Sequence, residues 1–230
     1  MQLNLHIWVV NTGGRGMLVK DVMTRNPVTV TPETSVTEAK NLMTRSKVGK
    51  LPVVDKNGTL VGIITGSDLV KATPSDATTL DMFELSYLLS KLTVEKVMHK
   101  DVKVVGEDET IEEAALLMAD YSISSLPVIT NNLVVGIITE GDLFKAFIDM
   151  FGTRYAGVRA TFVMGDIPGA LNQVTQRLAQ IQCNIVSLVT ADLLNSSERK
   201  VTLKVTDITP QQLEKVLCEY GAKLLDMRTV

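Results

Sequence analysis

The alternation of apolar and polar positions repeats itself in the first two thirds of the chain. Residues 22–69 align with residues 97–143 at an offset of 75, which drops to 74 after Gly58. The matches cluster in Val-Met, Glu-Ala, Leu-Pro-Val and Val-Gly-Ile-Ile-Thr runs, and each copy ends on Asp-Leu. Because self-similarity at a fixed period marks a repeated architecture, the chain is expected to hold two copies of one structural unit.

The pattern within each copy predicts the order β-α-β-β-α. In the first copy a β-branched stretch, 28–30, precedes a helix that starts at the capping box Ser35–Glu38. Two apolar strands, 50–55 and 60–65, follow around an Asn-Gly turn, and a last helix begins near Asp68. The corresponding segments of the second copy are 102–105, Thr110–Glu113, 126–130, 133–139 and a helix from Asp142. Such a sheet cannot bury both faces alone, so we expect the copies to pack around one core.

The segment between the copies carries apolar side chains at helical spacing. These side chains are Leu80, Phe83, Leu85, Leu88, Leu89 and Leu92. Their spacing predicts a helix that either packs on the repeat as a linker or pairs with a second chain.

The last third shows no copy of the repeat and predicts a different order of elements. Strands are expected at 159–164, 184–191, 200–206 and 222–227, with helices that open at Pro168-Gly169 and at Pro210. Gly221 is expected to end the second helix as a C-cap. The order β-α-β-β-α-β is ferredoxin-like. The whole chain is therefore expected to be α+β, with a β-α-β-β-α pair followed by a ferredoxin-like domain.

Composition narrows the classes of function. Of the 230 residues, 45% are hydrophobic and 21% are charged, a balance that excludes a disordered chain. The net charge of −3 lacks the basic excess of a nucleic-acid binder, and no apolar run reaches the ~18 residues of a membrane span. Two His and two Cys, Cys183 and Cys218, without ligand spacing argue against a metal site and fit reduced thiols.

The start of the chain indicates a loose tail or a mis-assigned start rather than a targeting segment. No Lys or Arg precedes the short apolar run Ile7–Val10, so residues 1–16 do not read as a signal peptide, and a cytoplasmic location is expected. The predicted domains are 17–71 for the first copy, 72–96 for the linker helix, 97–152 for the second copy and 153–230 for the last unit.

The repeated motifs resemble those of CBS domains, which occur as tandem pairs called Bateman modules. The resemblance covers about residues 22–148 and rests on Val-Met, Leu-Pro-Val and Gly-Ile-Ile-Thr-x-x-Asp at matching positions in both copies. One such Thr-x-x-Asp motif would be weak, whereas two in register are specific.

The Thr-x-x-Asp spacing has two interpretations. Thr65 and Thr139 can be helix N-caps, with Asp68 and Asp142 at the third helical position. The same carboxylates can also accept paired hydrogen bonds from a ribose diol, beside a helix start that favours phosphate. The resemblance to CBS pairs implies the second use, with an adenine nucleotide as regulatory ligand. It also implies adenine walls at Val48, Leu51, Pro52, Ile123, Leu126 and Pro127, while Lys47, Lys50 and His99 are candidate phosphate contacts or ordinary surface side chains.

The last unit resembles the ACT domain, a small-ligand regulatory module. The resemblance rests on Gly165-Asp-Ile-Pro-Gly-Ala-Leu171 and Cys183-Asn-Ile-Val186. It implies that Asp166, Gly169 and Asn184 line one amino-acid cleft where two ACT domains meet. The alternative is that these residues only shape a helix start and a turn, and that the domain only dimerises.

The order CBS–CBS–ACT is similar to the acetoin utilisation (AcuB) family. This resemblance implies a non-catalytic, homodimeric regulator of bacterial carbon metabolism that acts on a downstream protein. No Ser/His/Asp constellation, phosphate-binding loop or metal cluster supports an enzyme, and no catalytic residue or cofactor is expected. The remaining alternatives are an amino-acid sensor that acts through the ACT domain and an interaction module whose Thr-x-x-Asp motifs are only caps.

Overall fold

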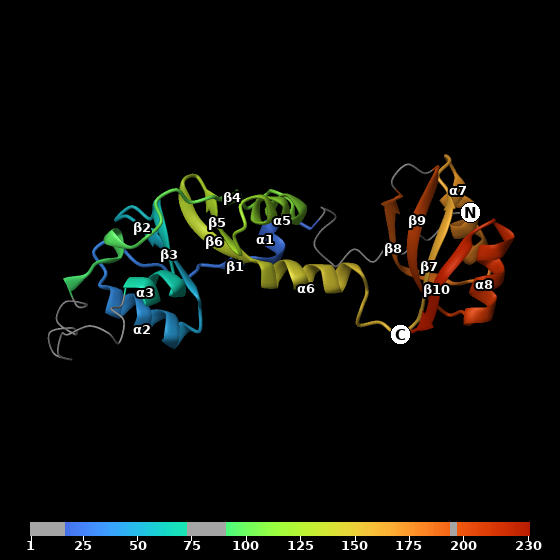
Figure 1. Ribbon diagram of the computed structural model, residues 1–230, viewed down its shortest axis with the longest axis horizontal. Coiled ribbons are helices and arrows are strands. Elements are labelled where there is room, and N and C mark those ends of the chain that lie inside the picture. Colours follow the sequence, from blue (N-terminus) through green and yellow to red (C-terminus); the bar gives the residue numbers. More distant parts are fainter. Residues whose placement is uncertain (1–16, 73–90, 194–196) are drawn as a thin grey trace. The chain divides into compact units, whose positions relative to one another are not determined.

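The computed structural model describes residues 17–72, 91–193 and 197–230 (Figure 1). The predicted tail and the linker residues 73–90 lie outside this range. The chain divides into two compact units, one that runs up to Leu143 and holds most of both repeats, and one that continues from Phe144 to Val230. Each unit is described by itself.

The first copy has the helices and the paired strands that its pattern predicts. Helix α2 spans Val36–Ser46 and starts at Ser35, whose hydroxyl accepts a 3.1 Å hydrogen bond from the Glu38 N–H. Strands β2 (Lys50–Val54) and β3 (Leu60–Thr65) pair antiparallel, and helix α3 (Gly66–Ala72) follows β3 without a gap. The strand expected at 28–30 is reduced to one parallel bridge between Val30 and Val53.

The second copy repeats this arrangement with a longer final helix. Its elements are β4 (Val105–Gly106), α5 (Ile111–Asp120), β5 (Ser125–Thr130), β6 (Leu133–Thr139) and α6 (Glu140–Met150). The Thr110 hydroxyl caps α5 by accepting a hydrogen bond from the Glu113 N–H. Strand β4 is parallel to β5 and β6 is antiparallel to it, in the sheet order β1-β6-β5-β4, where β1 is the short strand Thr24–Arg25.

The segment that leads into each copy is packed on the other copy. Helix α1 (Val19–Val22) and strand β1 (Thr24–Arg25) precede the first copy, yet β1 pairs with β6 of the second (Figure 1). In return, His99 of the second copy's leading segment exchanges two backbone hydrogen bonds of 2.9 Å with Ile63 in β3. The short 3-10 helix η1 (Val94–Lys96) also donates backbone hydrogen bonds to first-copy carbonyls. At the start of each copy, the residues therefore precede one copy in the chain but pack on the other.

Two glycines in the repeated Gly-Ile-Ile-Thr motif make this exchange possible. A Cβ at Gly62 would lie 2.5 Å from the Met98 sulfur and 3.0 Å from the His99 carbonyl oxygen. Met23 covers Gly136 in the same way. The methionine of each Val-Met pair thus packs on the glycine of the Gly-Ile-Ile-Thr motif in the other copy.

The last unit has the predicted ferredoxin-like order. Its elements are β7 (Val158–Gly165), α7 (Ala170–Gln180), β8 (Asn184–Asp192), β9 (Glu198–Thr206), α8 (Pro210–Glu219) and β10 (Lys223–Thr229). All strand pairs are antiparallel in the order β10-β7-β9-β8. Both helices pack on one face of the sheet, where the fully buried side chains include Phe162, Leu178, Leu203, Leu213 and Leu217.

The two cysteines are free thiols in different environments. Cys183 is buried and Cys218 is exposed. Burial raises the pKa of the Cys183 thiol to about 11, so it stays protonated at neutral pH. Across residues 17–72, 91–193 and 197–230, no His, Cys, Asp and Glu group of three or more is arranged to hold a metal ion. In the same ranges no helix combines the length and apolar character of a membrane span.

Replacing Gly62 by Ala is expected to destabilise the CBS-like unit. The added methyl group must displace Met98 and the backbone at His99, and overpacking of this kind costs about 1–3 kcal/mol of unfolding free energy. Chemical denaturation followed by circular dichroism measures this change.

The matched control is Gly49→Ala, because a Cβ at Gly49 meets nothing within 4 Å. This variant should unfold within about 0.5 kcal/mol of the parent chain. We call the residues that lead into one copy and pack on the other, 19–25 and 94–99, the exchanged segments. Equal stabilities for the two variants would contradict the close packing of the second exchanged segment on Gly62.

Candidate functional site

The junction between β3 and α3 brings Thr65 and Asp68 together. Asp68 Oδ2 accepts hydrogen bonds from the Thr65 N–H at 2.9 Å and from the Thr65 hydroxyl at 2.7 Å. The Thr65 Oγ1 in turn accepts a 3.3 Å hydrogen bond from the Asp68 N–H. These bonds form a capping box, and they engage one of the two carboxylate oxygens.

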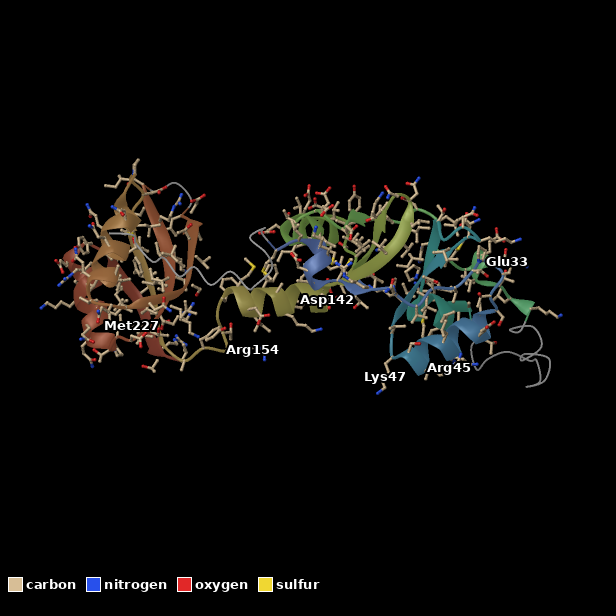
Figure 2. The ribbon with its side chains drawn as sticks, turned by 180° about the vertical axis from the view of Figure 1, so that it is seen from behind. Glu33, Arg45, Lys47, Asp142, Arg154 and Met227 are labelled. Carbon is tan, nitrogen blue, oxygen red and sulfur yellow. The ribbon has the colours of Figure 1, made fainter. Side chains whose placement is uncertain are left out.

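The junction between β6 and α6 has the same geometry. Asp142 Oδ2 accepts from the Thr139 N–H at 3.0 Å and from the Thr139 hydroxyl at 2.7 Å. Figure 2 shows Asp142 at the beginning of α6. The structure therefore pairs each predicted Thr with its predicted Asp, in both copies.

The second oxygen of Asp68 faces the segment exchanged from the other copy. Asp68 Oδ1 lies 3.0 Å from His99 Nε2. The aspartate side chain is 10% exposed, whereas the histidine is 63% exposed. Burial acts to raise the pKa of Asp68, but the bonds from Thr65 and the nearby His99 outweigh it and leave the pKa below its ordinary value. Asp68 is therefore an ionised acceptor at neutral pH.

The second copy has neutral or paired groups at the corresponding positions. Thr24 occupies in the repeat the place that His99 occupies in the first junction, and it pairs with Ile137 of β6. The neighbouring Arg25 donates to the Lys20 carbonyl at 3.1 Å and lies 4.0 Å from Glu107. The Arg25 guanidinium thus partly neutralises the negative charge of Glu107 in the second copy.

Only one of the two candidate phosphate lysines meets groups of the other copy. Lys50 donates to the Ser124 hydroxyl, and its burial lowers the pKa of the ammonium while the Glu140 carboxylate acts against this shift. Lys47 adopts φ 54° at the end of α2 and is exposed. Its backbone N–H donates to the Met43 and Thr44 carbonyls as the C-cap of α2, and its side chain points away from the ribbon in Figure 2.

The predicted adenine walls divide into core and surface positions. Leu51 and Leu126 are fully buried, and the adjacent Pro52 and Pro127 are buried as well. Val48 is 36% exposed and Ile123 is half-buried. In this conformation the side-chain surface available to a base therefore comes from the last two residues.

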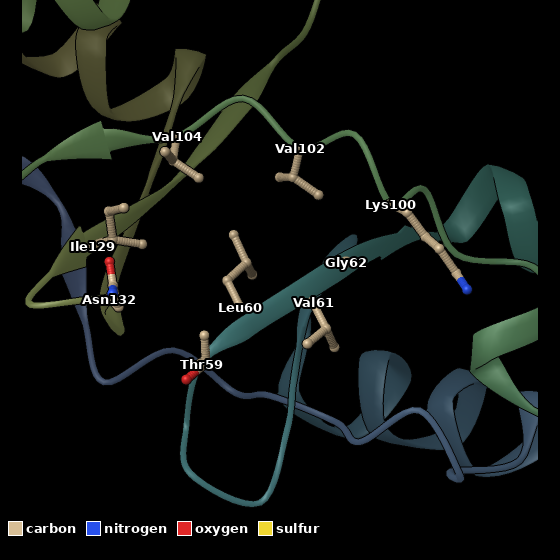
Figure 3. Close-up of a pocket in the computed structure, with 9 residues that line it drawn as sticks. All are labelled: Thr59, Leu60, Val61, Gly62, Lys100, Val102, Val104, Ile129 and Asn132. Carbon is tan, nitrogen blue, oxygen red and sulfur yellow. The ribbon is translucent and has the colours of Figure 1, made fainter.

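A cavity of about 220 Å³ lies beside the exchanged segment and was not anticipated from the sequence (Figure 3). Leu60 of β3 points toward the segment that carries Val102 and Val104. The other lining residues are Thr59, Val61, Gly62, Lys100, Ile129 and Asn132. The only signal for this cavity in the sequence is the β-branched run after Val97-Met98, because nothing local shows that this run crosses to the first copy.

A second cavity, of about 500 Å³, lies in the last unit at the turn before α7. Asp166, Gly169 and Arg199 line it, and Gly169 enters α7 with φ 86° and no side-chain cap. The Arg199 guanidinium lies 3.2 Å from the Asp166 carboxylate. The cavity therefore combines an ion pair with the open N–H groups of a helix start.

Asn184 lies at the opposite end of the same sheet from this cavity. It is opposite Thr206 in β9, whereas Gly165, next to Asp166, is opposite Glu198. Eight residues of strand separate these positions, or about 26 Å at ~3.3 Å per residue. Within one chain the three predicted ligand residues do not share a cleft, so the predicted cleft depends on a second chain.

Comparison with known proteins identifies both parts of the chain. The CBS domain model matches residues 19–75 and 94–149, and the TTHA0829-like ACT domain model matches residues 156–228. An uncharacterized protein of Methanocaldococcus jannaschii is 33% identical over 162 residues, which are 60% of this chain and 96% of that protein. The crystal structure of a putative acetoin utilization protein (AcuB) from Vibrio cholerae superposes with a TM-score of 0.51 at 31% identity, over 61% of this chain and 96% of that one.

Some relatives are enzymes of which this chain matches a small part. The L-aspartate semialdehyde sulfurtransferase of Methanocaldococcus jannaschii is 34% identical over 131 residues, or 56% of this chain. The match spans only 23% of that enzyme's length. The chain belongs to the CBS-domain family, as a CBS pair followed by a TTHA0829-like ACT domain.

Proposed function

We propose that this chain is a non-catalytic regulatory protein that binds an adenine nucleotide through its CBS pair. The observation that carries the proposal is the matched pair of Thr–Asp junctions. A helix cap uses one carboxylate oxygen, and Asp68 holds its other oxygen, ionised and little exposed, against a segment of the other copy. An acceptor in that position suits a ribose hydroxyl, because hydrogen bonds to charged acceptors are the strong ones.

His99 supports this use of Asp68. Its ring shows that a donor reaches Asp68 Oδ1, and its exposure leaves it free to rotate. In the proposed complex a ribose hydroxyl replaces the imidazole, which turns toward the phosphate. The cavity beside Val102 and Val104 has mixed polar and apolar walls, and its apolar side chains, Leu60, Val61, Val102, Val104 and Ile129, offer surface on which a purine could pack.

The Asp68→Asn and Asp142→Asn variants are expected to bind AMP more weakly. Asparagine keeps one carbonyl oxygen for the cap and replaces the other oxygen by an NH₂ group, which cannot accept a ribose hydroxyl. Loss of a charge-assisted hydrogen bond costs about 1.5–3 kcal/mol, or roughly ten- to a hundredfold in affinity for the affected cleft. Isothermal titration calorimetry with AMP measures each variant.

The capping box of α8 provides the matched control. Gln212 accepts hydrogen bonds from the Thr209 N–H and hydroxyl at 2.9 and 3.0 Å, as the two aspartates do from their threonines. Gln212→Ala should lower stability by about 1 kcal/mol and leave AMP affinity unchanged. Unchanged AMP affinity in both asparagine variants would reduce the Thr-x-x-Asp motifs to helix caps.

A second candidate function is the binding of a small amino acid by the ACT domain. The cavity at the turn before α7 favours it, because Asp166 can pair with an amino group and the N–H groups at the start of α7 with a carboxylate. Asn184 would complete the site from a second chain.

Thermal denaturation with each of the common amino acids tests this second function. A ligand present at about 100 times its dissociation constant adds about 2.7 kcal/mol of stability, a rise of several degrees. Asp166→Asn should abolish the rise. The control is Asp226→Asn, which removes the β10 carboxylate that pairs with Arg159 of β7, and this variant should keep the rise. The absence of any rise in the parent chain would leave the domain with a dimerising role.

The protein is further proposed to act as a cytoplasmic homodimer on a downstream protein of acetoin-type carbon metabolism. The ACT sheet leaves β8 and β10 as edge strands in this chain, and exposed edges are normally covered. Light scattering at micromolar concentration should give twice the 25.1 kDa of one chain. A mass of one chain would contradict the dimer.

A further inference from the structure

Lys204 is a buried cation on the face of the ACT sheet that the helices leave uncovered. It is 4% exposed, and its Nζ donates a 2.8 Å hydrogen bond to the Gly152 carbonyl. The neighbouring Val201, Leu203 and Val205 face the helices, so the alternating side chain of Lys204 faces away from them.

The surroundings of Lys204 make its position unexpected. In the ladder it lies opposite Arg159 on one side and Ser187 on the other. Arg159 is itself a cation and pairs with Asp226. Within the described part of the chain no carboxylate lies at ion-pair distance from the Lys204 ammonium. Because burial of a charge without a partner is strongly unfavourable, the carbonyl that accepts a hydrogen bond from Lys204 is needed to stabilise the buried ammonium.

The acceptor is the Gly152 carbonyl, two residues beyond the last residue of helix α6. Gly152, with φ 58°, ends the helix in the left-handed conformation, and the Thr153 N–H returns to the Ile148 carbonyl. The Ser187 hydroxyl donates to the Phe151 carbonyl at 3.1 Å. Two side chains of the ACT sheet therefore donate to the carbonyls of Phe151 and Gly152, the two residues that directly follow α6, at the end where the helix dipole favours a cation.

The amino end of the same helix is the second Thr–Asp junction. Helix α6 runs for 11 residues from Glu140, directly after Thr139, to Met150. Its first turn contains Asp142 in the capping box, and its last turn leads into the clamp formed by Lys204 and Ser187. One short helix thus carries a candidate ligand group at one end and an ACT contact at the other.

We propose that Lys204 couples the order of α6 to the order of the ACT sheet, so that a change at Asp142 alters the stability of strands β8 and β9. Ligand relay by this route rests on the proposed function, whereas the coupling itself does not. Lys204 is a positioning residue in this scheme, because it acts on α6 and touches no ligand.

Amide hydrogen exchange on the full-length chain, read by mass spectrometry, tests the coupling without ligand. Asp142→Ala, which removes the cap of α6, is measured in the parent chain and in a Lys204→Met chain. With Lys204 present, the variant should speed exchange in 184–192 and 198–206 by about threefold or more, and with methionine there the effect should vanish. Equal effects of Asp142→Ala in both backgrounds would overturn the proposal.

The matched control is Lys200→Met, on the same face of the same strand but exposed. It should leave the response to Asp142→Ala as in the parent chain. If Lys204→Met fails to fold, Ser187→Ala replaces it and should reduce the response in the same direction. A full response in a folded Ser187→Ala, Lys204→Met or doubly substituted chain contradicts the clamp.

A second arm adds saturating AMP and separates this inference from the proposed function. Protection of residues 139–142 together with β8 and β9 in the parent chain, but of 139–142 alone in the Lys204→Met chain, supports both ideas. Protection of β8 and β9 that persists in the Lys204→Met chain overturns the coupling and leaves AMP binding intact. If AMP protects no segment while the response to Asp142→Ala still depends on Lys204, AMP is rejected as the ligand and the coupling is supported.

Discussion

The close approach of an exchanged backbone segment to a side-chain-free position on β3 or β6 is the constraint on which the CBS pair depends. Gly62 admits Met98 and the His99 carbonyl, and Gly136 admits Met23. Without that space the leading segments would have to shift away from the strands of the opposite copy. Such a shift would weaken the backbone hydrogen bonds between each leading segment and its strand, and buried backbone groups are rarely left unpaired.

The same exchange assembles the candidate site. His99 reaches Asp68 only because its segment pairs with Ile63, two residues before Thr65. The cavity beside Val102 and Val104 arises from the continuation of that segment along β3. The contacts that stabilise the pair and the candidate ligand site are therefore built from one set of backbone contacts, so the proposed ligand binding and the packing of the two copies are expected to be linked through differential affinity.

The capping boxes and the ligand hypothesis are compatible because they use different oxygens of one carboxylate. The cap holds Asp68 Oδ2 in place, which orients Oδ1 toward the other copy. In the second copy the cap also begins helix α6, and the two residues that follow this helix are held by Lys204 and Ser187. A short helix restrained at both ends is stiffer than a free linker, which suits the transmission of a change along its axis.

The sequence by itself determined the repeat, both capping boxes, the paired strands and the ferredoxin-like order, because hydrophobic period, caps and turn residues act locally. It also identified the Thr–Asp pairs, whose partners are three residues apart. It did not show that the leading segments cross between copies, or that Leu51 and Leu126 belong to the core rather than to a cleft wall. Lys204 on Gly152 was equally invisible. These contacts join residues that are far apart in sequence, and only the tertiary packing of backbone on backbone decides which distant groups meet.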